Sequence, residues 1–204
     1  MDTDRQVIIG IVGGVGAGKS TVAGILAGLG CVVADSDAMA REALRDPDLR
    51  AKILSWWGPA VLDESGEIDR GVIAGIVFSS APQRRRLESL VHPWIETRRR
   101  ALFEQAPPDA RALVIDAPLL FEAGLDRECD AVVFVDTDRD RRVARLTGSR
   151  GWNEAELTKR EKSQLSLDDK RARADYFVIN NGDLDELSEQ VRRILNELTQ
   201  PHRS

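Results

Sequence analysis

Apolar residues in this chain gather in five short runs, in which they stand at consecutive positions and not at alternate ones. Each run is rich in β-branched residues, a pattern typical of parallel strands that helices cover on both faces. The runs are Val7–Val12, Cys31–Ala34, Ala112–Ile115, Ala131–Val135 and Tyr176–Ile179. Polar residues follow four of the runs: Asp35, Asp116, Asp136 and Asn180. Ligands bind at the carboxyl ends of strands in open α/β sheets, so these strand ends are candidates for a site.

Helical patterns separate the strands. The segment Lys19–Ala27 follows a glycine-rich turn and stops at Gly28-Leu29-Gly30, which suits a C-terminal cap. The last segment places its apolar residues on one helical face: Leu184, Leu187, Val191, Ile194 and Leu198. Alternating strands and helices predict right-handed crossovers, and therefore an α/β fold of three layers around a five-stranded parallel sheet.

Two connections are too long for a single crossover helix. The first, from Asp35 to Ala112, spans roughly 77 residues. It predicts several helices, one starting at Arg41–Leu44 and others over Leu49–Trp57, Arg70–Phe78 and Pro82–Gln105. We interpret residues 37–109 as a helical substrate-binding lobe and the second excess, residues 146–174, as a lid. The ranges 1–36, 110–145 and 175–204 then form the core.

Composition excludes several classes of protein. With 42% hydrophobic residues among 204, the chain can bury a core, which argues against disorder. A net charge of −5 argues against a surface made for nucleic acid, and no apolar run approaches the roughly 20 residues that span a bilayer. Cys31 and Cys129 lie far apart, without the spacing of a zinc site, and are expected as core fillers. We expect a cytoplasmic protein, a monomer or small homo-oligomer, without a membrane or nucleic-acid partner.

The segment directly after the first strand decides the class. It reads Gly-Gly-Val-Gly-Ala-Gly-Lys-Ser-Thr over residues 13–21 and fits the phosphate-binding P-loop pattern. Its glycines let backbone N–H groups surround a phosphate, and the helix that follows directs its positive end at the same anion. Lys19 would reach the β- and γ-phosphates of ATP, and the Ser20 hydroxyl would bind Mg²⁺. The predicted nucleotide-binding residues are Gly14, Gly16, Ala17, Gly18, Lys19, Ser20 and Thr21. The alternative is a chance glycine-rich turn between a strand and a helix.

Carboxylates at two other strand ends indicate phosphoryl transfer. Asp35 and Asp37 follow the second strand, and Asp116 ends the third. Asp116 is a candidate for the shell of the metal ion. Asp35, Ser36 and Asp37 could merely cap a helix, but capping needs one oxygen. One carboxylate is then left over that could accept the proton of an attacking hydroxyl, and the residues leave both readings open.

Positive charge is concentrated in residues 139–173. This stretch carries eleven Lys or Arg and six Asp or Glu, a net charge of +5, so the rest of the chain carries −10. Most of these side chains are expected on solvated helix faces. A lid over a triphosphate nevertheless needs one or two arginines, for which Arg150 is the first candidate and Arg145 the second.

Taken together, these motifs resemble the dephospho-coenzyme A kinase family. The resemblance rests on the P-loop, on Asp35-Ser36-Asp37-Ala38-Met39-Ala40-Arg41-Glu42, on His92-Pro93 and on Asp116-Ala117-Pro118-Leu119-Leu120-Phe121-Glu122-Ala123-Gly124. Arg150, Arg160, Gln164, Ala174-Asp175 and Asn180-Asn181-Gly182 follow in the order of the family. The resemblance implies a P-loop kinase that transfers the γ-phosphoryl group of ATP, with Mg²⁺, to the ribose 3′-hydroxyl of dephospho-coenzyme A, the last step of coenzyme A biosynthesis.

The resemblance also implies residue roles. Asp37 corresponds to the proposed base, Lys19 to the P-loop lysine and Arg150 to the lid arginine that contacts phosphate. Arg41, His92 and the Pro118-Leu119 segment border the acceptor site. Two positions depart from the family pattern, Val12 in place of threonine and Ser36 in place of alanine or glycine.

Several of these residues also have local interpretations. His92-Pro93 could end a helical turn, because a proline disfavours helical conformation in the residue before it. The Pro118–Phe121 segment could be a packed loop, and Trp56, Trp57 and Trp94 are expected to pack the lobe.

Two rival functions remain at this point. One is a kinase of another nucleoside or nucleotide, which a P-loop and a lid do not exclude. The other is a GTPase-like switch or an ATP-dependent binding module without a small-molecule acceptor. Against the GTPase, the sequence lacks an Asn-Lys-x-Asp guanine-reading segment: Asn180-Asn181-Gly182-Asp183 has no lysine.

Overall fold

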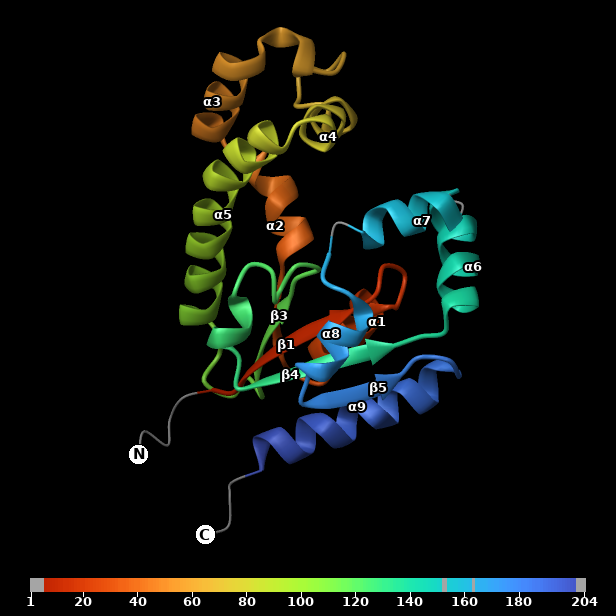
Figure 1. Ribbon diagram of the computed structural model, residues 1–204. Coiled ribbons are helices and arrows are strands. Elements are labelled where there is room, and N and C mark those ends of the chain that lie inside the picture. Colours follow the sequence, from red (N-terminus) through yellow and green to blue (C-terminus); the bar gives the residue numbers. More distant parts are fainter. Residues whose placement is uncertain (1–5, 152–153, 163, 201–204) are drawn as a thin grey trace. The chain divides into compact units, whose positions relative to one another are not determined.

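The protein, described here by a computed structural model over residues 6–151, 154–162 and 164–200, contains a five-stranded parallel sheet (Figure 1). The sheet order is β2-β3-β1-β4-β5. The strands are β1 (Ile8–Gly13), β2 (Val32–Asp35), β3 (Leu113–Asp116), β4 (Ala131–Asp136) and β5 (Tyr176–Ile179). All five predicted strands are therefore confirmed, each within one residue at either end.

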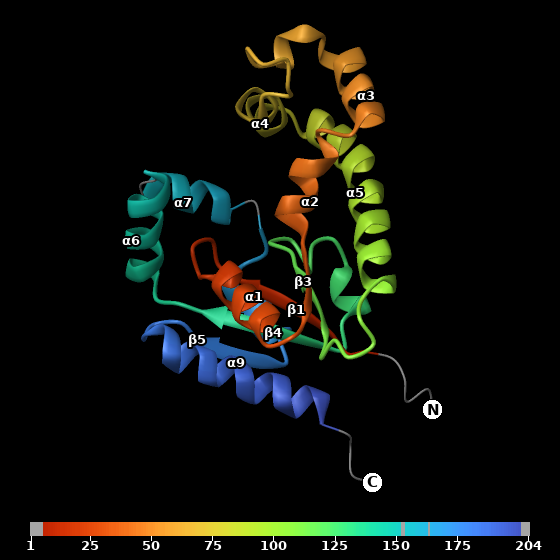
Figure 2. The ribbon, with the colours of Figure 1, turned by 180° about the vertical axis from the view of Figure 1, so that it is seen from behind.

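The chain divides into two compact units, one running up to Asp35 and resuming at Ala106, the other Ser36–Gln105. The first unit holds the sheet and its helices: α1 (Lys19–Gly28), α6 (Arg139–Arg150), α7 (Glu154–Glu161), α8 (Leu167–Ala172), α9 (Leu184–Thr199) and the short 3₁₀ helix η2 (Leu125–Glu128). Views from the front and the back show α1 and α8 on opposite faces of the sheet (Figures 1 and 2). This is the three-layer arrangement that the consecutive apolar runs predict.

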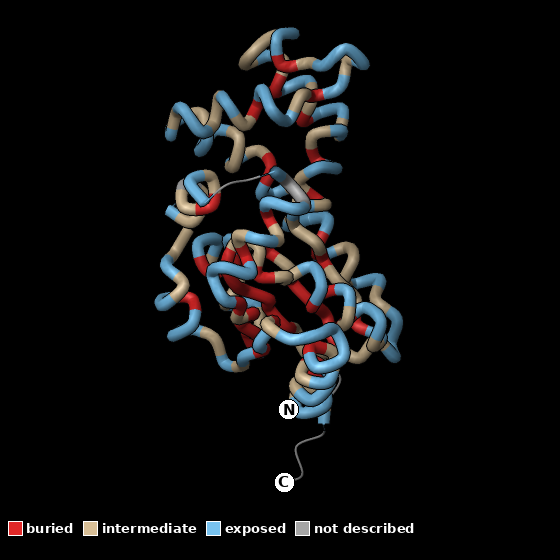
Figure 3. The backbone as a smooth tube through the Cα atoms, turned by 90° about the vertical axis from the view of Figure 1, so that its right-hand side faces the viewer, coloured by how far each residue is buried: buried red, intermediate tan, exposed pale blue. Residues whose placement is uncertain are grey.

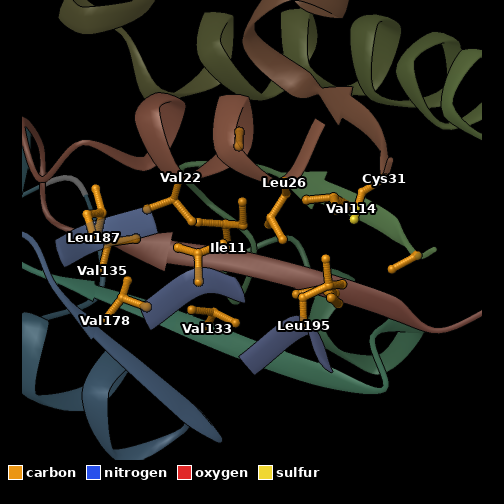
Figure 4. Close-up of a cluster of buried hydrophobic side chains, with 14 of the residues drawn as sticks. Ile11, Val22, Leu26, Cys31, Val114, Val133, Val135, Val178, Leu187 and Leu195 are labelled. Carbon is orange, nitrogen blue, oxygen red and sulfur yellow. The ribbon is translucent and has the colours of Figure 1, made fainter. Parts of the chain in front are cut away.

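The main core lies between the sheet and the helices α1 and α9. Val22 and Leu26 of α1 and Leu187 and Leu195 of α9 are buried against alternate residues of the strands (Figure 4). The strand residues that they meet include Ile11, Val114, Val133, Val135 and Val178. Cys31 fills this core as expected, and burial raises the pKa of its thiol. Figure 3 colours the chain by burial, and the longest buried runs, residues 9–14 and 131–135, fall mostly within β1 and β4.

The second unit is helical. It consists of α2 (Ser36–Ala43), α3 (Pro47–Trp57), the 3₁₀ helix η1 (Pro59–Val61), α4 (Arg70–Ser79) and α5 (Ala81–Glu104). Side-chain oxygens of Asp46, Asp69 and Ser80 cap three of these helices. Trp57 and Trp94 pack in the apolar clusters of this unit, as expected.

Three of the predicted helices are confirmed within two residues at either end, and the predicted start of the first helix was wrong. Helix α2 begins at Ser36, five residues earlier than the predicted start at Arg41, so Ser36 and Asp37 belong to its first turn. Pro93 lies inside α5, as the predicted helix Pro82–Gln105 requires, and the alternative that His92-Pro93 ends a helical turn is wrong. Val91, Trp94 and Ile95 pack on either side of it, and the Trp94 indole donates to Asp46 at 3.0 Å. This packing outweighs the backbone hydrogen bond that a proline forgoes.

Within the described residues, no helix combines the length and the apolar character needed to cross a bilayer.

Candidate active site

The loop between β1 and α1 has the backbone of an anion-binding site. Gly16 and Gly18 adopt positive φ angles of 79° and 92°, which side-chain-bearing residues rarely take. The Ala17 N–H donates to the Gly14 carbonyl at 3.1 Å, which tightens the turn. Gly18 is the N-cap of α1 and offers no side chain to the N–H groups of the first turn. The Thr21 N–H donates to the Gly18 carbonyl at 3.0 Å. The N–H groups before it are those for which a helix has no intrahelical acceptor, and such groups can bind an anion.

Lys19 lies over this loop. Its ammonium donates to the carbonyls of Gly13 and Gly14, both at 3.3 Å. Ser20 and Thr21 follow in the first turn of α1, and their residues are exposed. A phosphate held by the loop would therefore meet the ammonium and the helix end together.

The far side of the loop is fixed by hydrogen bonds to a single carbonyl. The Ala17 oxygen accepts from Thr137 Oγ1 and from Asn180 Nδ2, both at 2.8 Å, and from Arg145 at 3.3 Å. Arg145 also donates to the Asn180 carbonyl at 2.9 Å. The ends of β4 and β5 and helix α6 thus hold the loop in place. Among these residues, the sequence singled out Arg145 and Asn180, and it gave no signal for Thr137.

This packing predicts the effect of adding one methyl group at Gly18. A Cβ there would lie 2.2 Å from Asn180 Nδ2, and the positive φ would add strain of about 1–3 kcal/mol. We expect Gly18→Ala to weaken ATP binding by about tenfold or more, measured by titration calorimetry. Gly24→Ala is the matched control, because Gly24 lies exposed in the same helix with no atom near its Cβ position. Equal ATP affinity of the Gly18 variant and the wild type would contradict this role of the loop.

Two carboxylates lie at the same edge of the sheet. Asp116 ends β3 and is in register with Ile11 of β1 on one side and Asp35 of β2 on the other. Ser20 lies in the first turn of α1, the helix that follows β1, and Asp116 ends the neighbouring strand β3. Both elements therefore meet the carboxyl edge of the sheet. A hydroxyl and a carboxylate are hard oxygen donors, and Mg²⁺ takes one or two such ligands together with phosphate oxygens and water. This donor set fits a magnesium ion that binds with the nucleotide.

Arginines of α6 connect the loop to α7. The Arg142 side chain is 4% exposed, donates to the Thr137 carbonyl at 3.2 Å and forms an ion pair with Glu161 of α7. Arg139 donates to Glu161 at 3.0 Å as well. The sequence placed most cations of this region on solvated faces, and Arg142 is an exception. Arg150 ends α6, but its side chain lies outside the described residues, so its predicted contact with phosphate stays a prediction.

A buried lysine that the sequence did not single out forms a hydrogen bond with the segment after β3. Lys170 of α8 is 1% exposed, and its ammonium donates to the Pro118 carbonyl at 3.0 Å. Burial lowers the pKa of Lys170, and the charge of nearby Glu122 opposes that shift. Leu119 beside Pro118 is 38% exposed, as a residue lining an acceptor site would be.

The second unit carries the other predicted residues. Asp37 and Arg41 are exposed and stand four residues apart on α2, which puts them on one face of that helix. His92 is exposed on α5, and its neighbour Val91 packs in a cluster with Ala43 of α2. Helices α2 and α5, which pack against each other, thus carry all three residues.

Comparison with known proteins identifies the family. A family model for dephospho-CoA kinase (CoaE) matches residues 7–186. The dephospho-CoA kinase of Syntrophotalea carbinolica is 39% identical over 196 residues, which cover 95% of this chain and 92% of that one. The enzyme of the same name from Arabidopsis thaliana is 35% identical over 199 residues, covering 95% and 84%.

A solved structure shares this fold over nearly the whole chain. The crystal structure of TT1252 from Thermus thermophilus has a TM-score of 0.81 to this one at 34% identity, and the match covers 96% of this chain and 100% of that chain. The sheet, the P-loop and these matches together show that the chain belongs to the dephospho-CoA kinase family.

Proposed function

We propose that this chain transfers the γ-phosphoryl group of ATP to the ribose 3′-hydroxyl of dephospho-coenzyme A, the last step of coenzyme A biosynthesis. One observation carries the proposal: an uncapped helix N-terminus with a lysine folded over its loop, in a chain that matches the dephospho-CoA kinase family over residues 7–186. The loop can hold a triphosphate, and the family match supports the acceptor.

The transfer is an in-line displacement in which the protein supplies position and charge. A bond forms between the 3′-oxygen and the γ-phosphorus, the bond from that phosphorus to the β,γ-bridging oxygen breaks, and ADP leaves. We assign the proton of the hydroxyl to Asp37, which follows β2 by two residues. Lys19 and the N–H groups of the loop stabilise the charge of the transferring group. Magnesium, held by Ser20 and Asp116, would neutralise phosphate charge when bound.

The remaining parts receive roles in the same proposal. Residues 37–109 form the lobe that binds the acceptor, with Arg41, His92 and the Pro118-Leu119 segment beside the substrate. Residues 146–174 form the lid. Arg150, near the start of the lid, contacts phosphate. The ion pairs of α6 with α7 support this role, because they join the predicted lid to the helix that also holds the P-loop.

The contacts of one residue, Asn180, argue against a guanine-dependent switch and so favour a kinase. Asn180, which begins the segment compared with a guanine-reading motif, is 7% exposed. Its amide nitrogen donates to the Ala17 carbonyl and its amide oxygen accepts from Arg145. Its polar atoms are therefore engaged in holding the P-loop.

A product analysis tests the proposal. We expect incubation with Mg-ATP and dephospho-coenzyme A to yield a product one phosphoryl group heavier, identified by mass spectrometry, and adenosine, AMP or uridine to yield none at a comparable rate. A Lys19→Met preparation serves as the control for contaminating kinases. Phosphorylation of a nucleoside in place of dephospho-coenzyme A would establish the rival kinase function. ATP hydrolysis without any phosphorylated acceptor would establish the switch.

A cytoplasmic location, a monomeric or small homo-oligomeric state, and the lack of a nucleic-acid partner stay predictions.

A further inference from the structure

The buried ammonium of Lys170 contacts the segment that follows β3. The Lys170 side chain is 1% exposed, and its three N–H donors have three acceptors. These are the Pro118 carbonyl at 3.0 Å, Gln164 Oε1 at 2.9 Å and Glu122 Oε1 at 3.3 Å. The charge of Lys170 is therefore fully hydrogen-bonded in a place that water does not reach.

The acceptors of Lys170 belong to two different parts of the fold. Pro118 and Glu122 lie in the segment after β3, whereas Gln164 lies in the connection from α7 to α8. Glu122 Oε1 also accepts from the Leu165 N–H, at 2.7 Å. The Glu122 carboxylate and the Lys170 ammonium thus link the segment after β3 to the connection between two helices.

Stability gives no sufficient reason for a lysine at this position. Removing an ammonium from water disfavours its charged form, so burial lowers the pKa of Lys170, and the charge of Glu122 offsets only part of this shift. Replacing a buried ion pair by apolar side chains of similar size is often neutral or stabilising. An apolar side chain, however, cannot hold a backbone carbonyl at one place, and three hydrogen bonds from one ammonium can.

The held carbonyl is close in sequence to residues of the proposed site. Pro118 follows Asp116, the proposed magnesium ligand, by two residues and precedes the exposed Leu119. A shift of the Pro118 carbonyl would displace both neighbours, and small misplacements of reacting groups slow a reaction strongly.

We infer that Lys170 is a positioning residue for phosphoryl transfer: with Glu122 and Gln164 it fixes the segment after β3 to the α7–α8 connection. The inference rests on the proposed function, since it concerns the rate of that reaction. Lys170 would touch no substrate atom and would act through Pro118 and Asp116.

The kcat of a variant in which Lys170 and Glu122 are both replaced by uncharged residues tests the inference. Lys170→Met leaves Glu122 without its cation, so the decisive variant is the double change Lys170→Met with Glu122→Gln, which removes both charges. We expect kcat for dephospho-coenzyme A to fall about 10- to 100-fold in the double variant, with the KM for ATP within about threefold of wild type. We expect its unfolding temperature to be at or above that of Lys170→Met. Lys170→Arg, which keeps a cation with several donors, should retain more of the wild-type kcat than Lys170→Met.

Arg111→Met is the matched control. Arg111 precedes β3 at the opposite end of the strand and donates to Asn196 and Thr199 of α9, at 2.8 and 3.2 Å. Its loss should change the unfolding temperature and leave kcat unchanged. A double variant of Lys170 and Glu122 with the kcat of wild type would overturn the inference, as would an equal loss of kcat in Arg111→Met. A wild-type chain that phosphorylates no dephospho-coenzyme A would instead overturn the proposed function, and the inference with it.

Discussion

Replacing Lys19 by methionine is expected to lower kcat/KM for phosphoryl transfer by about 10²- to 10³-fold, the range measured when one preorganised donor to a developing charge is removed. In the structure the ammonium lies 3.3 Å from two carbonyls of the loop, so it stands over the place where a phosphate would bind. Methionine keeps the length and apolar stem of the side chain and removes the charge. Because backbone N–H groups still bind the anion, ATP affinity should fall less than kcat.

The measurement is a steady-state assay with purified variants, paired with titration of ATP. Lys52→Met is the control, because Lys52 is an exposed lysine on α3 with no assigned role in the site. An unchanged kcat/KM in the Lys19 variant would refute its role in catalysis. A loss confined to ATP affinity would limit Lys19 to binding the nucleotide.

The sheet could be predicted because burial on both faces marks each strand as a run of consecutive apolar residues. Ile9 and Ile11 pack in the core that α1 and α9 cover. Val12, the next residue of β1, points to the opposite face of the sheet and is equally buried. The order of the strands in the sheet could not be predicted in this way. It depends on pairings such as Ile9 with Val114 and with Ala131, which join residues more than a hundred positions apart.

Helix α2 shows where a local pattern gives the wrong boundary, and α5 shows where a prediction from the wider pattern holds against a local one. The polar Asp35-Ser36-Asp37 segment suggested a cap before the helix, yet α2 begins at Ser36 itself, directly after β2. Pro93 would locally disfavour a helix, but apolar residues on both sides of it pack into one cluster. At Pro93 tertiary packing outweighs the local preference.

The glycine-rich turn between β1 and α1 was predictable because its glycines act locally, but the contacts that hold the turn from distant parts of the chain were not. Thr137 and Asn180 reach the Ala17 carbonyl from 120 and 163 residues away. Arg142 and Lys170 look like their solvated neighbours in a strongly charged stretch, yet both are buried. Only the packed fold distinguishes a cation that holds a backbone carbonyl from one that faces water.

Replacing Asp37 by asparagine is expected to lower kcat by about 10²- to 10³-fold while the KM for ATP changes little, as the loss of a general base predicts. Asp37 is exposed in the first turn of α2, and among the described residues its carboxylate has no hydrogen-bond partner. The hydroxyl of the preceding residue, Ser36, is buried and has no hydrogen-bond partner among the described residues. A carboxylate that caps no helix and remains exposed can accept a proton from a substrate hydroxyl.

A structural role for Asp37 predicts a different result. A negative charge in the first turn of a helix adds stability of about 0.3–1 kcal/mol, and asparagine would remove it without touching the reaction. Asp48→Asn is the matched control, because Asp48 is an exposed acid in the first turn of α3. If Asp37 is the base, the two variants lose similar stability, and kcat falls in Asp37→Asn while that of Asp48→Asn stays at the wild-type value. Equal turnover by both variants and the wild type would show that Asp37 serves the helix and that another group takes the proton.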